Sequence, residues 1–107
     1  FAPQRWLEKF PADRVVMPDT AADDLDDVPE GGRRLMDEAA RFFRGMKAAE
    51  AERPGSWREA VRCYQAAAAF ADAQIGRLLD ALDATERGRE TIVVLWSDHG
   101  YQLGEKE

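Results

Sequence analysis

The sequence predicts an α/β fold in which this chain is mostly helical and supplies one buried core strand. Two helical patterns, over residues 33–51 and 56–83, precede an apolar run at residues 91–97. The run reads TIVVLW from Thr91 to Trp96. Its apolar residues do not alternate with polar ones, which is typical of a strand buried on both faces of a parallel sheet. A helix, a short loop and a buried strand form half of a doubly wound α/β unit.

The single strand shapes the expectation for domain organisation. A lone strand has no partner for its ladder of N–H and C=O groups, so the rest of a sheet must come from elsewhere. The first residue is Phe1 rather than methionine, and the last residues, Gly104 to Glu107, carry no terminating signal. We therefore expect residues 1–107 to be an internal part of a single larger domain.

Composition argues against several classes of function. The chain has 21 acidic and 15 basic residues, a net charge of −6, and scattered basic positions, so we expect no nucleic-acid partner. Its one cysteine, Cys63, excludes a disulfide framework or a cysteine-rich zinc site within these residues. No apolar run reaches about 18 residues, so no membrane span is expected. The usage of Ala and Arg suggests a bacterial source. The sequence leaves open whether the protein is cytoplasmic, periplasmic or secreted, and it leaves the oligomeric state open.

Residues 1–32 are expected to be a loop, because prolines at positions 3, 11, 18 and 29 disfavour a continuous helix. The acidic stretch from Asp19 to Asp27 invites comparison with a calcium-binding loop. An EF-hand loop needs ligands at alternate positions, a central glycine and a closing glutamate. This stretch lacks that spacing and that closing acid, so we interpret it as a solvated turn.

Two helices are expected to follow. In residues 33–51 a spacing of four and three predicts one amphipathic helix, with Leu35 and Met46 on its apolar face. In residues 56–83 the same spacing predicts a long helix that begins with a capping box between Ser56 and Glu59. Cys63 lies in this helix and is interpreted as a structural thiol. The apolar stripe of the long helix consists of Trp57, Val61, Tyr64, Ala68, Ala71, Ile75, Leu78 and Leu82.

An aspartate and the only histidine follow the apolar run directly. In open α/β sheets ligands bind outside the carboxyl ends of the strands, which is where Asp98 and His99 occur. A carboxylate oxygen and an imidazole nitrogen both bind divalent cations, and Gly100 allows a sharp turn beyond them. Two ligands are too few for a hard cation that takes about six. Residues 98–107 are therefore a candidate metal-site loop that needs further ligands, and an ordinary capped loop is the alternative.

At these residues the sequence resembles the type I sulfatases, most closely the branch that contains iduronate-2-sulfatase and choline sulfatase. The resemblance rests on a helix pattern, D-x-Q-x-G-x-L-L-x-A-L, and on a strand pattern, T-I-V-V-[FLW]-x-S-D-H-G, followed by x-x-L-G-E. Here the first pattern covers Asp72 to Leu82 and the second covers Thr91 to Glu105. The opening FAPQRWLEKFP also looks like a segment of these sulfatases, whereas residues 18–52 match weakly.

The resemblance implies an alkaline-phosphatase-like fold, a sandwich in which a mixed, largely parallel sheet lies between helices, with this chain inside one catalytic domain. It implies a sulfuric ester hydrolase that acts on a small-molecule sulfate ester and binds one calcium ion. Asp98 takes the place of a calcium ligand, and His99 that of a calcium ligand or a sulfate contact. The family's substrate-contacting lysine comes shortly after L-G-E, and Lys106 lies near that place without a clear match.

The nucleophile that the resemblance implies is absent from the chain. The family makes a formylglycine from Cys or Ser in a C/S-x-P-x-R motif near the N-terminus, and no such motif occurs here. Cys63 is followed by Tyr64, Gln65 and Ala66, so it does not match. We therefore expect a formylglycine upstream of these residues, no catalytic residue within them, and no activity from residues 1–107 alone.

Three alternatives stay open. A phosphomonoesterase, phosphodiesterase or phosphonate hydrolase of the same superfamily can carry S-D-H-G at a strand end. A catalytically inactive relative would keep only the scaffold. A helical interaction module built on residues 57–82 is also compatible with the spacing, although the small side chains of Ala68 and Ala71 argue against a coiled coil.

Overall fold

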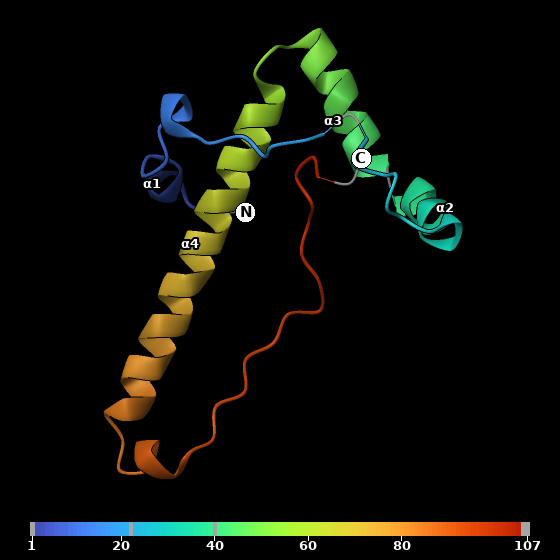
Figure 1. Ribbon diagram of the computed structural model, residues 1–107. Helices are drawn as coiled ribbons and strands as arrows, with labels where there is room; N and C mark the ends of the chain where they lie inside the picture. The colour runs from blue at the N-terminus through green and yellow to red at the C-terminus, as the bar shows by residue number, and fades with distance from the viewer. Residues whose placement is uncertain (1, 22, 40, 106–107) are drawn as a thin grey trace.

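The computed structural model describes residues 2–21, 23–39 and 41–105 (Figure 1). The longest helix, α4, is the centre of the arrangement: α1, α3 and both 3₁₀ turns contact it, while α2 contacts α3. Among the residues described, no helix combines the length and the apolarity of a membrane span. In chain order the elements are α1 (Gln4–Leu7), the 3₁₀ turn η1 (Ala12–Arg14), α2 (Glu30–Ala39), α3 (Arg41–Glu52), α4 (Ser56–Asp83) and the 3₁₀ turn η2 (Gly88–Glu90).

Helix α4 covers the range predicted for the long helix, but it begins by a different mechanism. The N-cap is Gly55, with a left-handed φ of 93°, and the Ser56 hydroxyl donates backwards to the Arg53 carbonyl (2.7 Å). The carboxylate of Glu50 accepts hydrogen bonds from the backbone N–H groups of Gly55 (2.9 Å) and Trp57 (2.8 Å). The predicted capping box is therefore wrong, because a side chain from the end of α3 already satisfies the first turn of α4.

The N-terminal segment is not the continuous loop expected for residues 1–32. It contains α1 and η1, and α2 begins at Glu30, directly after Pro29. A proline suits the start of a helix because the N–H that it lacks would have no intrahelical partner there. Residues 23–27 of the acidic stretch form turns. Short helical pieces between the prolines therefore replace the single loop.

Two arginines of α4 hold this N-terminal segment. The Arg62 guanidinium donates to the backbone carbonyls of Phe10 (2.6 Å) and Leu7 (3.0 Å). The Arg58 guanidinium donates to the carbonyl of Val15 (2.6 Å). Charged donors to carbonyl groups give stronger bonds than neutral donors do. The α4 helix thus fixes the path of a segment that has little regular structure of its own.

The helix expected over residues 33–51 is present as two helices, α2 and α3. Met46, on the expected apolar face, is 8% exposed, whereas Leu35, on the same face, is 69% exposed. The reason is that α3 packs on α4 while α2 extends away from it (Figure 1). Residue 40, between the two helices, lies outside the described residues.

Residues 91–97 do not form the buried core strand that their apolar run predicts. They follow an extended path back along α4 (Figure 1), but no strand occurs in the described part of the chain. Every residue of the run is exposed, Ile92 by 90% and Trp96 by 82%. A strand is stabilised by the strands beside it, and no second extended segment is paired with this one in residues 2–21, 23–39 and 41–105.

The described residues form an open arrangement. The radius of gyration is 18.2 Å, against about 13 Å for a compact domain of this length. The few buried apolar side chains gather around the first half of α4, where Trp6 also packs edge-on against Phe70 with ring centroids 5.8 Å apart. These buried side chains are Val15, Met46, Val61 and Ala66.

Candidate functional site

The residues after Trp96 form a loop that returns to the N-terminal end of α4 (Figure 1). The Ser97 hydroxyl donates to the His99 carbonyl (2.7 Å), which closes a bend around Asp98. Such a bond between near neighbours is a local alternative to regular secondary structure. The bend leaves the side chains of Asp98 and His99 accessible, at 89% and 66% exposure.

Asp98 and His99 lie beside each other within this bend. Nε2 of His99 is 3.8 Å from Oδ2 of Asp98, and Nδ1 of His99 is 3.2 Å from the Gly100 carbonyl oxygen. Since a carbonyl oxygen only accepts, Nδ1 carries the proton in this hydrogen bond. In the neutral ring Nε2 then presents a lone pair on the side of the Asp98 carboxylate. Tyr101 packs edge-on against the imidazole, with ring centroids 5.8 Å apart.

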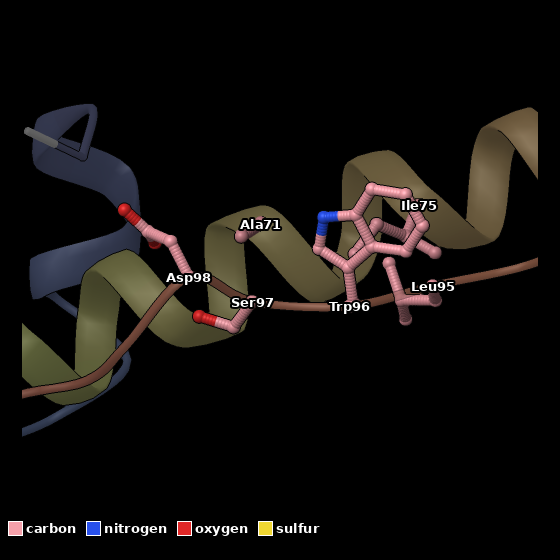
Figure 2. Close-up of a pocket in the computed structure, with 6 residues that line it drawn as sticks. All are labelled: Ala71, Ile75, Leu95, Trp96, Ser97 and Asp98. Carbon is pink, nitrogen blue, oxygen red and sulfur yellow. The ribbon is translucent and has the colours of Figure 1, made fainter.

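An open groove separates this bend from the middle of α4 (Figure 2). The oxygens of Asp98 and Ser97 stand towards one end of the groove, and the apolar side chains of Leu95, Trp96 and Ile75 stand towards the other (Figure 2). The groove therefore joins a polar end to an apolar wall. Its lining residues are Ala71, Ile75, Leu95, Trp96, Ser97 and Asp98.

Two further contacts anchor the loop to α4. Gly100 lies against Tyr64, since a Cβ built on Gly100 would stand 3.4 Å from the Tyr64 hydroxyl oxygen. The indole N–H of Trp57 donates to the Leu103 carbonyl (2.6 Å). Successive members of the set Trp57, Tyr64 and Ala71 are two helical turns apart, so they share one face of α4. The loop runs along this face of α4 from the groove to the L-G-E sequence.

The described residues hold no group of three or more His, Cys, Asp or Glu side chains able to bind a metal ion. Asp98 and His99 stand as a pair. Cys63 is exposed, and desolvation together with the negative charge of Glu59 raises the pKa of its thiol. A nucleophilic cysteine needs a lowered pKa, so Cys63 does not suit that role. Lys106, the other candidate substrate contact, lies outside the described residues.

Comparison with known proteins decides the family. Residues 1–107 match the Sulfatase family. The chain belongs to this family. It is 38% identical, over 99% of its length, to a sulfatase of Formosa agariphila, and it spans 20% of that protein. Over 48 residues it is 44% identical to human iduronate 2-sulfatase and 40% identical to the mouse protein, covering 45% of the chain and 9% of each relative. No solved structure matches the chain significantly.

The resemblance inferred from S-D-H-G and L-G-E is thereby confirmed. Membership in the sulfatase family supports the predicted α/β class. The described residues themselves contribute helices and one exposed extended segment, so the sheet of that class is not visible within them.

Sequence reasoning missed two supports of the candidate site. The apolar repeat places Trp57 in the stripe of the long helix and gives no role to its N–H group, yet a half-buried Trp usually finds a partner for that group. Gly104 reads only as part of the L-G-E pattern, although it is buried and has a left-handed φ of 139°. The indole N–H of Trp57 and the glycine of L-G-E are both visible in the sequence. Their contact joins distant parts of the chain, so the sequence alone does not predict that the two residues meet.

Proposed function

We propose that the full-length protein that contains this chain is a sulfuric ester hydrolase and that Asp98 and His99 belong to its active site. The family match and the two kinds of relatives named as sulfatases support the reaction class. One observation carries the residue assignment: an accessible carboxylate and an imidazole lie 3.8 Å apart directly after the apolar run.

The pair fits a divalent cation, which we take to be calcium. Apart from its contact with His99, the Asp98 carboxylate has no ion pair or hydrogen bond among the described residues, so its oxygens are available as ligands. Calcium ligands lie about 2.3–2.6 Å from the ion, and two atoms 3.8 Å apart can both reach one ion at such distances. Calcium prefers oxygen to nitrogen, which makes Asp98 the stronger ligand of the two.

His99 is better suited to contact the sulfate group. When its ring is protonated, Nδ1 keeps its hydrogen bond to the Gly100 carbonyl and Nε2 donates to an anionic oxygen. A positive imidazolium next to a cation ligand favours binding of a singly charged sulfate ester group over binding of a neutral one. The backbone contact thus fixes the direction in which the ring offers its second nitrogen.

The remaining chemistry comes from outside this chain. A formylglycine supplies the nucleophile when present, and a cation at Asp98 supplies charge that stabilises the sulfate oxygens in the transition state. The described residues contribute binding and orientation: the Asp98 carboxylate binds the cation, and His99 directs a ring nitrogen at the sulfate group. Further metal ligands must also be provided by the rest of the protein, because the described residues hold no group of three or more His, Cys, Asp or Glu side chains able to bind a metal ion.

The test is Asp98→Asn in the full-length protein, with Asp80→Asn as the matched control. Asparagine keeps the size of the side chain and removes its charge. We expect kcat/KM for an aryl sulfate to fall by about 10²-fold or more, since one electrostatic contact to the transition state is lost. Calcium affinity, measured by isothermal titration calorimetry, should fall as well. Asp80 is exposed on α4, so its substitution should change neither quantity.

Two results would redirect this assignment. Turnover like that of the wild type in the Asp98→Asn variant would remove Asp98 from the active site. Hydrolysis of phosphate esters without any release of sulfate by the wild-type protein would favour the phosphoesterase alternative, because the same loop serves both types of anion.

A further inference from the structure

The loop that carries Asp98 and His99 ends on the indole of Trp57. The Trp57 Nε1–H donates to the Leu103 carbonyl at 2.6 Å. The bond joins residues 46 positions apart and is partly buried, so it closes a long stretch of chain rather than a local turn. Residues 97–103 thus run from the bend at Asp98 to a fixed point on α4.

Gly104 makes this contact close. It is buried, and a Cβ at this position would overlap Cζ2 of Trp57 and stand 3.2 Å from Cγ2 of Thr20. Its φ of 139° also lies in the region that disfavours every residue except glycine. The backbone of the L-G-E sequence therefore lies directly against the indole ring, and no side chain could intervene.

Trp57 is itself held in place. Its backbone N–H donates to the Glu50 carboxylate (2.8 Å), and the other oxygen of this carboxylate accepts from the Gly55 N–H (2.9 Å). The indole thus projects from the corner where α3 meets α4, which is fixed by charge-assisted hydrogen bonds. Because the backbone of Trp57 is fixed, its indole can hold the loop that it contacts at a defined position.

The dimensions of the two elements agree along their shared path. Extended chain from Trp96 to Gly104 covers about 26 Å, and α4 rises by about 27 Å between Ile75 and Trp57. The segment is not fully extended, because bends occur at Asp98, Leu103 and Gly104. The groove contact near Ile75 and the contact at Trp57 nevertheless hold its two ends against α4, so only a short loop lies between them.

We propose that Trp57 is a positioning residue for Asp98 and His99. Its indole holds the far end of the loop, so that the carboxylate and the imidazole keep their places relative to α4. The consequence for the metal rests on the proposed function, in which Asp98 binds a cation. The positioning itself is a property of this chain and is measurable without metal.

The experiment compares Trp57→Phe with Trp6→Phe in the full-length protein. Both substitutions remove an indole N–H and keep an aromatic ring. The N–H of Trp6 is buried and has no hydrogen-bond partner among the described residues, so it is a matched control. In metal-free protein, hydrogen exchange of the Leu103 amide, which donates to the Glu105 carboxylate (2.8 Å), should be about threefold to tenfold faster in Trp57→Phe only, the factor expected for one lost hydrogen bond.

The second readout is the dissociation constant for calcium, which Trp57→Phe should raise by a similar factor while Trp6→Phe leaves it unchanged. Gly104→Ala, which places a Cβ against the indole, should accelerate exchange more than Trp57→Phe does. Exchange in Trp57→Phe equal to that in Trp6→Phe would overturn the inference. A wild-type protein that binds no calcium, with exchange still faster in Trp57→Phe, would keep the positioning role and contradict the metal assignment at Asp98 instead.

Discussion

The two halves of α4 differ in their surroundings although one apolar repeat runs through both. In residues 56–70, the docked half, Val61 and Ala66 are 2% and 0% exposed, and the N-terminal segment and α3 cover the helix. In residues 71–83, the open half, no residue is buried, and Leu78 is 70% exposed. The repeat alone does not indicate the covered face, because Ala66, outside the repeat, is buried, whereas Tyr64 and Ala68, within it, are exposed. The neighbouring segments decide which face and which length of α4 are covered.

This difference bears on the candidate site. The docked half supplies the two contacts at Tyr64 and Trp57 that hold the loop after His99. The open half faces the exposed apolar run at residues 91–96, and in the proposed full-length sulfatase we expect the remaining sheet to cover both. The site is thus anchored to the part of the helix that this chain stabilises by itself.

The largest expected effect comes from Arg62→Met in the docked half. The change leaves the carbonyls of Phe10 and Leu7 without their charged donor, at a cost of about 3 kcal/mol in unfolding free energy. Arg77→Met in the open half loses only a bond to Gln74 on an exposed surface (3.0 Å), and should stay within about 0.5 kcal/mol of the wild type. Equal losses in the two variants, measured by chemical denaturation of the full-length protein, would contradict the comparison.

A smaller effect is expected for Ala66→Leu. Ala66 is 0% exposed, so a larger side chain must displace its neighbours, at a cost of about 2 kcal/mol. Ala68→Leu, on the exposed side of the same turn, should change the unfolding free energy by less than about 0.5 kcal/mol. Thermal denaturation of both variants measures the difference. Ala68 belongs to the apolar repeat and Ala66 does not. If Ala68→Leu proves the more destabilising, the covered face is therefore the one that the repeat predicts, and the burial of Ala66 is contradicted.

Local features of this fold were predictable from the sequence. The range of α4 follows from the spacing of its apolar residues and from the sequence ERPGS before it. The bend at Asp98 depends on a bond between Ser97 and His99, which are two positions apart. The candidate pair at Asp98 and His99 could be named for the same reason, because neighbours in sequence are neighbours in space.

Features that depend on distant partners were not predictable. The cap of α4 comes from Glu50 rather than from Ser56, since the turn between the helices brings the carboxylate back to the first backbone N–H groups. The run at residues 91–97 has the composition of a strand, but composition does not provide the neighbouring strand that burial requires. The contact of Trp57 with Leu103 likewise needs the return of the chain along α4.

The smallest effect, and the one that tests the corner beneath Trp57, is the pH dependence of Glu50. Hydrogen bonds from the backbone N–H groups of Gly55 and Trp57 lower the pKa of this carboxyl below its usual 4.5. Because the folded-state pKa is lowered, the stabilisation is fully present above about pH 4.5 and is lost as the pH falls through the lower, folded-state value. Glu50→Gln should therefore remove part of the acid dependence of stability.

The matched control is Glu52→Gln, a change of an exposed carboxylate at the last residue of α3. Unfolding free energies of the full-length variants, measured from neutral pH down to about pH 3, give the slope that linkage relates to proton uptake. The slope below about pH 4.5 should be shallower in Glu50→Gln than in the wild type and in Glu52→Gln. Identical slopes in all three proteins would mean that the Glu50 carboxylate does not hold the start of α4. The argument that Glu50 fixes the backbone of Trp57 would then be wrong as well.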